Sequence, residues 1–222
     1  MGVATVDEQA LRGFVREQTE LASVPFVPEV RLHQAASAIA LWEHTEETKG
    51  QADLPPPFWG FAWAGGQAVA RYVLDHPEVV AGRRVLDLAA GSGLVAVAAA
   101  LRGAAEVTAA EIDAYAVAAI ALNAEANGVE LDAVLADLLG GDGAPAEVVL
   151  AGDVFYERAM AERVLPFLNR ARARGALVLV GDPGRAYLPR GAFTEAAVYQ
   201  VPTAADLEDS KVKTTTVWRL DG

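Results

Sequence analysis

The sequence predicts an α/β protein in which a mostly parallel sheet is covered by helices on both faces. The first reason is residues 83–93, RRVLDLAAGSG, where an apolar run leads into a turn of small residues and then into the helical pattern of residues 94–101. Strand, glycine turn and helix in this order are typical of a nucleotide-binding unit, with the ligand over the turn. The second reason is that apolar runs and helical patterns keep alternating as far as Val180.

The end of the chain differs from this alternation. Residues 196–201 and 214–220 are β-rich segments joined by a polar loop, so they predict a closing antiparallel pair. Between the glycine turn and this pair, further strands are expected at residues 106–111, 133–136, 148–151 and 176–180. Helices are expected at residues 67–74, 115–127 and 157–174, the last one bent at Pro166.

The first 54 residues lie outside the nucleotide-binding unit. They are expected to form an N-terminal extension, and residues 55–222 the main domain. Thr5 and Glu8 have the spacing of a helix start, which predicts a helix to about Thr19. A short strand is expected at residues 30–33, whereas residues 35–44 fit either a helix or a strand. This extension is expected to cap the ligand or to serve as a platform for the substrate.

Composition excludes several classes of function. The 222 residues include no cysteine, so disulfides, thiolate metal sites and cysteine nucleophiles are excluded, and no metal is expected. The formal net charge of -12 argues against binding to nucleic acid and fits a basic partner, such as a lysine-bearing protein surface. No apolar run approaches the ~20 residues that span a bilayer, and no targeting segment is recognised, so no membrane contact and a cytoplasmic location are expected.

The glycine turn leaves two kinds of ligand open. Gly91 and Gly93 allow the backbone to approach a ligand closely, and with Ala96 they also fit the dinucleotide fingerprint of an NAD-dependent oxidoreductase. Asp87, at the end of the first strand, favours a different ligand. Its carboxylate would repel a pyrophosphate but suits the ammonium and sulfonium groups of S-adenosylmethionine (AdoMet), which has no phosphate.

Acidic residues also follow the next two predicted strands. Glu111 stands where a carboxylate can accept both hydrogen bonds of a ribose diol. Asp113 competes for that role but is better suited to cap the next helix. Asp137 stands where an adenine amino group would arrive. Ligands of such sheets bind at the carboxyl ends of the strands, so these acids together indicate one site.

The segment of residues 54–66, LPPPFWGFAWAGG, precedes the first strand of the unit. Its aromatic residues fit either a packed core or the wall of a pocket, and the glycines among them favour the pocket wall. None of the three histidines stands in a spacing typical of acid–base catalysis.

Several motifs together resemble a known family. VLDLAAGSG, AAEID, ALNAEANG and ADLL look like the motifs of class I AdoMet-dependent methyltransferases. The segments PPFWGFAWAGGQAVARYVLD, VVLAGDVFYE, GDPGR and TTTVW are similar to the lysine methyltransferases that act on the electron transfer flavoprotein beta subunit. The resemblance covers residues 55–218 and departs from the usual pattern at Ala89, where a glycine is typical, and at Glu111, where aspartate is typical.

The resemblance implies a Rossmann-like, seven-stranded, mostly parallel sheet of strand order 3-2-1-4-5-7-6, with an N-terminal helical extension. It implies AdoMet as cofactor. The predicted cofactor-binding residues are Trp63, Asp87, Ala89, Gly91, Gly93, Glu111, Ile112, Asp137 and Leu138. The predicted catalytic residues are Asp153 and Tyr156, which match the family's D-x-x-Y motif beside the transferring methyl.

The predicted function is therefore AdoMet-dependent methylation of lysine side chains on a protein, with the electron transfer flavoprotein beta subunit as the expected partner. A monomer is expected. The alternatives are N-methylation of a small amine resembling nicotinamide and a non-catalytic AdoMet-binding module. Which lysines are modified, and how many methyl groups each receives, does not follow from the sequence.

Overall fold

The computed structural model describes residues 7–50, 54–203 and 210–221. Its α-helices are α1 (Glu8–Gln18), α2 (Ala38–Lys49), α3 (Ala64–Asp75), α4 (Leu94–Leu101), α5 (Ala114–Asn127) and α6 (Arg158–Ala173). Its strands are β1 (Glu20–Val24), β2 (Val27–Gln34), β3 (Arg84–Leu88), β4 (Glu106–Glu111), β5 (Asp132–Leu135), β6 (Val148–Gly152), β7 (Leu177–Asp182), β8 (Phe193–Pro202) and β9 (Val212–Leu220). Short 3-10 turns lie at Phe58–Gly60, Pro77–Val79 and Arg190–Ala192.

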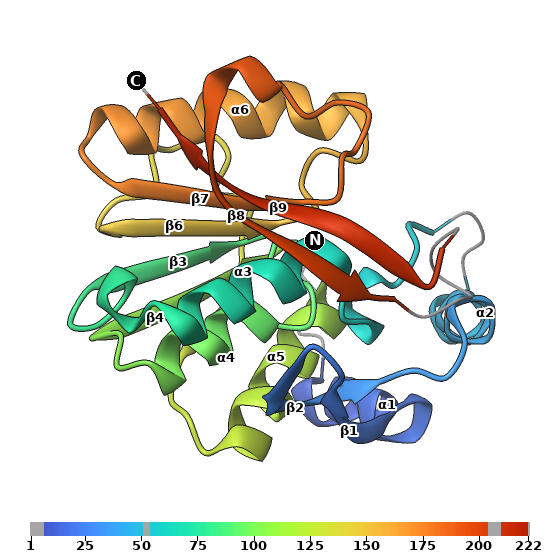
Figure 1. Ribbon diagram of the computed structural model, residues 1–222. Coiled ribbons are helices and arrows are strands. Elements are labelled where there is room, and N and C mark those ends of the chain that lie inside the picture. The colour runs from blue at the N-terminus through green and yellow to red at the C-terminus, as the bar shows by residue number, and fades with distance from the viewer. Residues whose placement is uncertain (1–6, 51–53, 204–209, 222) are drawn as a thin grey trace.

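Seven strands form the main sheet, in the order β5-β4-β3-β6-β7-β9-β8. The strands from β5 to β7 run parallel, whereas β9 is antiparallel to both β7 and β8. This is the predicted 3-2-1-4-5-7-6 order with its closing antiparallel pair, so the fold prediction is confirmed. α3, α4 and α5 cover one face of the sheet and α6 covers the other (Figure 1).

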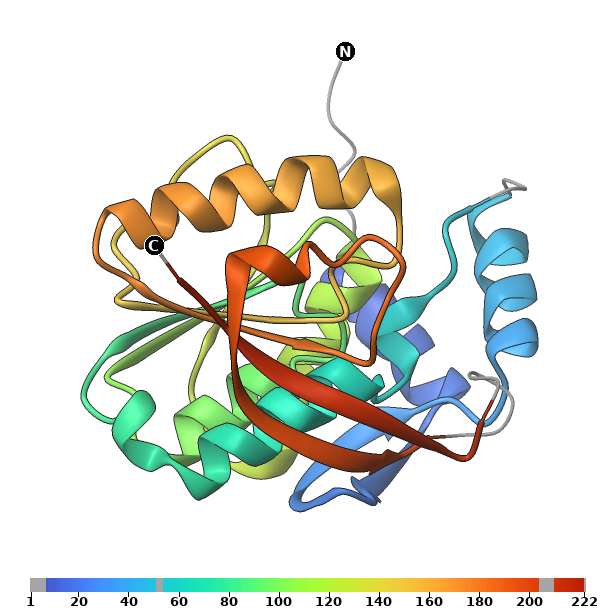
Figure 2. The same ribbon diagram turned by 45° about the horizontal axis from the view of Figure 1, so that its top comes forward.

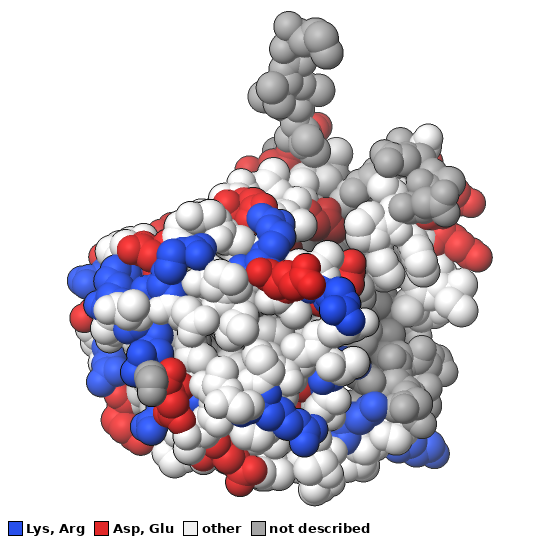
Figure 3. Space-filling model, turned by 90° about the horizontal axis from the view of Figure 1, so that it is seen from above, with Lys and Arg blue, Asp and Glu red and all other residues white. Residues whose placement is uncertain are grey.

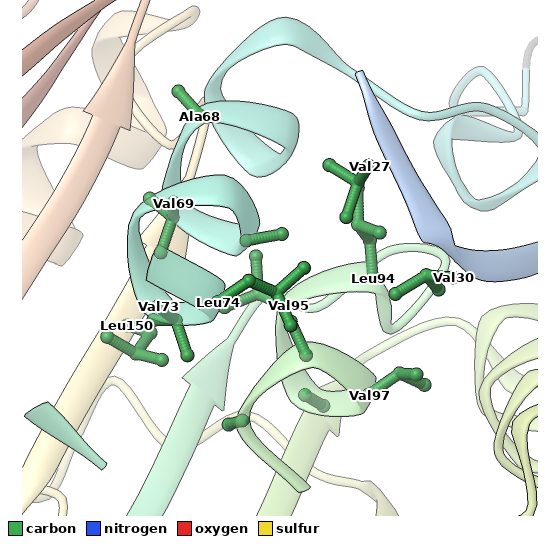
Figure 4. Close-up of a cluster of buried hydrophobic side chains, with 14 of the residues drawn as sticks. Val27, Val30, Ala68, Val69, Val73, Leu74, Leu94, Val95, Val97 and Leu150 are labelled. Atoms are coloured by element: carbon green, nitrogen blue, oxygen red, sulfur yellow. The ribbon is translucent and has the colours of Figure 1, made fainter. Parts of the chain in front are cut away.

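Alternation along β3 decides what each face of the sheet receives. Val85 joins the buried cluster under α3 and α4, together with Val73, Val95 and Leu150 (Figure 4). Leu86 and Leu88 join the cluster on the α6 side. Since successive side chains of a strand point to opposite faces, Asp87 is directed to the α4 side. The same periodicity that builds the core therefore delivers a carboxylate to the start of α4.

The helix α3 lies unusually close to the sheet. A Cβ added to Gly65 would lie 2.3 Å from the carbonyl oxygen of Gly181, and one added to Gly152 would lie 2.6 Å from the amide nitrogen of Gly66. Real Cβ atoms essentially never approach backbone this closely. Glycine at these positions thus lets the N-terminal turn of α3 rest directly on the ends of β6 and β7.

The N-terminal extension differs in part from the prediction. It contains not only helices but also an antiparallel hairpin of β1 and β2, and the segment left open as helix or strand forms α2. The predicted strand is part of β2, whereas β1 was missed. The reason is that Val24 is the one fully buried residue of β1, so the strand carries no alternating apolar pattern.

The start of α1 is capped by Asp7, whose side chain accepts a hydrogen bond from the amide of Gln9 at 3.0 Å. The predicted cap at Thr5 lies outside the described residues. In Figures 1 and 2, α1, the hairpin and α2 lie together on the right of the molecule. Val27 and Leu32 of β2 belong to the same buried cluster as α3 and α4. The extension thus shares a core with the main domain, and a division at residue 54 stays a prediction.

None of the described helices is long and apolar enough to cross a membrane. Within the described ranges, no group of three or more histidine, aspartate or glutamate side chains is arranged to hold a metal ion.

Candidate active site

The turn between β3 and α4 adopts the left-handed backbone conformation at three positions. Ala89 has a φ angle of 53°, Gly91 of 55° and Gly93 of 76°. Gly93 is also constrained by space, because an added Cβ would lie 3.1 Å from the side chain of Ile120. Ala89 therefore adopts, at a cost in backbone strain, the conformation for which glycine is suited.

Asp87 is 1% exposed and lies under the first turn of α4, where its Oδ2 accepts a hydrogen bond from the amide of Ala96 at 2.9 Å. Burial raises the pKa of Asp87 to about 8, and the nearby charge of Glu111 adds to the rise. A positively charged ligand at this carboxyl group would favour its ionised form.

Glu111 connects the end of β4 to the glycine turn. Its Oε1 accepts from the amide of Gly91 at 2.8 Å and its Oε2 from the amide of Ile112 at 2.9 Å. Burial raises the pKa of Glu111. Ile112 is 74% exposed, which leaves an apolar side chain in solvent next to these carboxylates. Asp113 caps α5 through the amide of Tyr115 at 3.0 Å, as predicted.

The third predicted acid sits in a different environment. Asp137 is exposed after β5 and forms an ion pair with Arg163 at 2.5 Å. Its hydrogen bond with Arg163 lowers the pKa of Asp137. Leu138, the next residue, packs against the core on the α6 side. The predicted contact of Asp137 and Leu138 with adenine stays a prediction.

Trp63 and Tyr156 belong to one aromatic cluster. The indole of Trp63 donates to the carbonyl of Phe58 at 2.8 Å, and the Phe58 ring lies 5.7 Å from that of Trp63 and 5.3 Å from that of Tyr156. Phe61 lies 6.2 Å from Trp63 on another side. We call Phe58, Phe61, Trp63 and Tyr156 the aromatic wall. The structure thus brings together two residues that are 93 positions apart in the sequence.

Tyr156 connects this wall to the acidic site. Burial raises the pKa of Tyr156, and the charges of Glu157 and Glu111 raise it further, so its hydroxyl lies within the electrostatic reach of Glu111. The side chain is still 40% exposed. Tyr156 is therefore a member of the aromatic wall that stays partly open to solvent.

Asp153 is held more firmly than its sequence context indicated. Its Oδ2 accepts from the amides of Gly65 at 2.5 Å and Gly66 at 3.2 Å. Its Oδ1 accepts from Nε of Arg185 at 3.2 Å and from Nη2 at 2.8 Å. These four hydrogen bonds match the roughly four acceptor positions of a carboxylate. The predicted contact of Asp153 with a substrate lysine stays a prediction, and in this conformation both oxygens of its carboxylate accept hydrogen bonds from the chain itself.

Sequence reasoning singled out neither Arg185 nor its neighbour Asp182 as functional. The GDPGR segment was recognised as a family motif, but no chemistry was attached to it. A role for Arg185 is visible only in the structure, where β6 lies beside β7 and the guanidinium of Arg185 binds Asp153. A glycine followed by an acid at the end of each strand, Gly152-Asp153 and Gly181-Asp182, was the available signal.

Comparisons with known proteins agree with this geometry. The family model of ribosomal protein L11 methyltransferase (PrmA) matches residues 70–156. The electron transfer flavoprotein beta subunit lysine methyltransferase of Xenopus laevis is 35% identical over 95% of this chain and 87% of that protein. The protein of the same name from Homo sapiens is 31% identical over 98% and 84%.

Solved structures agree on the fold. A 16S rRNA methyltransferase of T. thermophilus, in complex with AdoMet and guanosine, aligns with a TM-score of 0.52 and 24% identity, over 73% of this chain and 44% of that one. The fold is therefore that of AdoMet-dependent methyltransferases.

Proposed function

Because this chain belongs to the family of electron transfer flavoprotein beta subunit lysine methyltransferases, we propose that it methylates lysine side chains of that subunit. The observation that carries the proposal is the meeting of three features at one end of the sheet. These are the buried Asp87 and the half-buried Glu111 at the glycine turn, the aromatic wall, and the half-exposed Tyr156 within that wall.

The residues at the turn fit AdoMet. Asp87 is buried and Glu111 is half-buried, and their hydrogen bonds described above come from backbone amides rather than from a basic side chain. A ligand that brings its own positive charge would offset the cost of keeping these carboxyl groups ionised. AdoMet brings an ammonium and a sulfonium, and it supplies a methyl group whose departure leaves a neutral thioether.

Each predicted cofactor-binding residue has a role in the proposal. Asp87 would hold the ammonium, and Glu111 would accept from the two ribose hydroxyls, as acids at these positions of such folds do. The exposed Ile112 and the neighbouring Leu138 offer apolar surface to the adenine ring, and Asp137 offers an acceptor for its amino group. Ala89, Gly91 and Gly93 shape the turn that allows this close approach, and Trp63 closes the site from the side of the aromatic wall.

The lysine amine needs orientation and loss of its proton. A lysine in water has a pKa near ~10.4, so most amines arrive charged and must deprotonate before they attack. The Tyr156 hydroxyl remains protonated at neutral pH, since its pKa is raised, yet it still has lone pairs that can accept a hydrogen bond from the amine. In the proposal, Tyr156 aligns the nitrogen, the aromatic wall excludes bulk water, and a water at the exposed edge carries the proton away. Alignment of this kind supplies a large part of the rate enhancement in such displacements.

The expectations of a cytoplasmic location and a monomeric state belong to the same proposal. They come from the sequence, and they stay predictions. Net charge of -12 supports the choice of a basic protein surface over a nucleic acid. In Figure 3, Lys and Arg side chains gather at the left of the view. The carboxylates described above lie at the carboxyl ends of the parallel strands.

The test is intact-mass analysis of purified electron transfer flavoprotein beta subunit after incubation with this protein and AdoMet. We expect the mass of the wild-type subunit to rise by about 14 Da, one methylene, for each methyl group transferred. This rise should disappear when the modified lysines are changed to arginine. Nicotinamide, assayed in parallel, represents the small-amine alternative. Methylation confined to the small amine, or no methylation of either, would contradict the proposed function. AdoMet binding without any transfer would favour a non-catalytic module.

A further inference from the structure

The loop after β7 is fixed by a buried acid. Asp182 is 1% exposed, and its Oδ1 accepts hydrogen bonds from the amides of Gly184 at 2.6 Å and Arg185 at 2.7 Å. Gly184 has a φ angle of 92°, which only glycine adopts readily. The backbone of the GDPGR segment therefore has a defined shape, and that shape directs the Arg185 side chain toward the end of β6.

Arg185 and the start of α3 share the Asp153 carboxylate. The guanidinium of Arg185 binds one oxygen of Asp153, and the amides of Gly65 and Gly66 bind the other. Asp153 itself is 8% exposed and has a φ angle of 55°, a conformation that a non-glycine residue adopts only when its surroundings hold it there. Its amide donates to the carbonyl of Gly181 at 2.9 Å. The buried carboxylate of Asp153 thus links the end of β6 and the loop after β7 to the N-terminus of α3.

This carboxylate replaces the missing cap of α3. The N-cap residue of α3 is Trp63, which makes no side-chain hydrogen bond to the helix amides. An ionised acid at a helix N-terminus satisfies free amides and interacts favourably with the helix dipole. Asp153 provides this from another part of the sequence. Trp63, and with it the aromatic wall, stands directly before the amides that Asp153 holds.

We propose that Arg185 is a positioning residue for methyl transfer: it holds the Asp153 carboxylate, in its charged form, against the N-terminus of α3 and so fixes the aromatic wall beside the reacting groups. This inference rests on the proposed function, since the reaction it serves is lysine methylation. Arg185 acts through Asp153 and the helix, and touches neither methyl donor nor amine.

The electrostatics of Asp153 support this role. Burial raises its pKa to about 6, the charge and hydrogen bond of Arg185 oppose that rise, and the charge of Asp182 adds to it. Asp182 and Arg185 are the charged groups that face Asp153 from the β7 end, and the amides of Gly65 and Gly66 face it from α3. Without Arg185, burial and Asp182 would both favour the protonated acid, which is a weaker cap.

The first experiment compares Arg185→Gln and Arg185→Lys with the wild type, as pH profiles of kcat and KM for methylation of the flavoprotein beta subunit. We expect Arg185→Gln to lower kcat by about 10- to 100-fold at pH 7 and to move the acidic limb of the profile upward by about one pH unit or more, because Asp153 must be ionised to hold the helix. Raising the pH should restore part of the activity. Arg185→Lys keeps the charge and should keep the acidic limb near that of the wild type.

The control is Arg158→Gln. Arg158 is an exposed arginine at the start of α6 whose guanidinium lies 5.4 Å from the ring of Tyr187. The Arg158→Gln substitution removes one positive charge from the same end of the molecule, and the pH profile of this variant should match that of the wild type. AdoMet affinity, measured by calorimetry, should stay within about fivefold of the wild type in all variants, since the hydrogen bonds described for Arg185 go to Asp153 and Asp182 and not to the glycine turn.

A second measurement does not need a substrate. Carbon-13 NMR of labelled aspartate carboxyl groups should show the Asp153 titration moving upward by about one pH unit or more in Arg185→Gln, with Asp153→Asn identifying the signal. An unchanged Asp153 titration, or an unchanged pH profile in an active Arg185→Gln, overturns the inference. So does a lower KM with undiminished kcat, which would mean that Arg185 competes with the substrate lysine. A wild type without methylation activity would refute the proposed function instead, while the NMR result would still test the contact. If Arg185→Gln does not fold, the pH profiles of Arg185→Lys and of the Arg158→Gln control are compared with that of the wild type instead.

Discussion

Two pairs of carboxyl groups lie at the carboxyl ends of the parallel strands, and they differ in what neutralises them. Asp87 and Glu111, near the ends of β3 and β4, receive their hydrogen bonds from backbone amides. Asp153, directly after β6, pairs with the guanidinium of Arg185, and Asp182, the last residue of β7, accepts a hydrogen bond from the backbone amide of Arg185. Burial raises the pKa of all four. Arg185 opposes the rise at Asp153 and Asp182, whereas the charge of Glu111 adds to the rise in the pKa of Asp87.

This difference separates a pair of acids suited to bind a ligand from a pair of acids that stabilises the fold. Burying a carboxyl group without a cationic partner is expensive, so a protein that keeps such a pair has a reason outside its own fold. A cationic ligand with hydroxyl donors supplies that reason at Asp87 and Glu111. The second pair already has its cation, and its hydrogen bonds go to α3 and to the loop after β7. One half of the site is thus completed by the ligand, the other by the chain itself.

The largest expected effect concerns the first pair. Glu111→Ala should weaken AdoMet binding by roughly 2–4 kcal/mol, because two hydrogen bonds to a charged acceptor are lost. That corresponds to about 30- to 1000-fold in Kd, measurable by calorimetry. The fold should survive, since Glu111 is the last residue of β4.

The matched control is Asp113→Ala, two residues further on. Asp113 caps α5, so its loss should lower the free energy of unfolding by about 1 kcal/mol and leave AdoMet affinity nearly unchanged. If the affinity falls in Asp113→Ala and not in Glu111→Ala, the ribose assignment moves to Asp113 and the contrast between the two pairs loses its basis.

Most of the fold could be predicted because its signals are local. A buried parallel strand followed by a glycine turn, as at residues 83–93, is recognisable without tertiary contacts. The hairpin of the extension was harder, since the exposed Ala22 and Ser23 of β1 depend on pairing with β2 for their conformation. The N-cap of α5 at Asp113 was predicted correctly because a cap interacts with its own helix.

For the candidate site, too, the sequence indicates only those residues whose signal is local. Asp87 and Glu111 could be proposed from the sequence because they stand at strand ends next to a motif. Arg185 could not, because its partner Asp153 lies 32 positions away, and Gly65, in the helix that both support, lies 88 positions from Asp153. The predicted strand order places β6 beside β7, but it does not indicate which side chain of the loop after β7 reaches Asp153. The acid at position 153 was therefore interpreted as a ligand for substrate, without the arginine beside it.

The close seating of α3 on the second pair gives the next test. Gly65→Ala should lower the free energy of unfolding by about 1–3 kcal/mol, because its Cβ would collide with backbone and with the Asp153 carboxylate. Gly66→Ala is the control: an added Cβ there meets nothing within 4 Å, and urea unfolding should find it at least as stable as the wild type. Equal stability of both variants would show that α3 does not depend on this contact.

The third prediction compares the protonation of the two pairs. Asp87 has a pKa of about 8 in the free protein, so at pH 7 most molecules carry it protonated, and a cationic ligand must displace the proton. AdoMet binding at pH 7 should release up to about one proton, and its affinity should rise by up to about tenfold per pH unit as the pH approaches 8.

Calorimetry in buffers of different ionisation enthalpy measures the released proton. Asp87→Asn should abolish both the release and the pH dependence, at a lower affinity. Identical binding enthalpies across buffers for the wild type would mean that the first pair is already ionised, and that the protein rather than the ligand neutralises it.

The sign for stability follows from the same pKa. Since the folded-state pKa of Asp87 lies above its unfolded value, its contribution to the stability of the ligand-free protein is fully present below about pH 4 and is lost as the pH rises through about 8. AdoMet should therefore raise the melting temperature more at pH 8 than at pH 6. A larger rise at pH 6 would contradict the assignment of the ammonium to Asp87.

The smallest effect belongs to the turn between the two members of the first pair. Ala89 adopts a left-handed conformation that costs an L-residue roughly 1–2 kcal/mol, part of which Gly would regain before its greater freedom in the unfolded chain is counted. Ala89→Gly should thus raise the free energy of unfolding by about 1 kcal/mol or less. Ala90→Gly is the control, because Ala90 has no positive φ and the same change should lower stability by about 0.5–1 kcal/mol. Urea unfolding of both variants measures these changes.

Ala89→Gly could instead destabilise the protein and leave AdoMet affinity intact. In that case the methyl group of Ala89 stabilises the fold more by packing on the α6 side of the sheet than backbone strain in the turn destabilises it. The alanine at this position would then be explained by packing rather than by the cofactor.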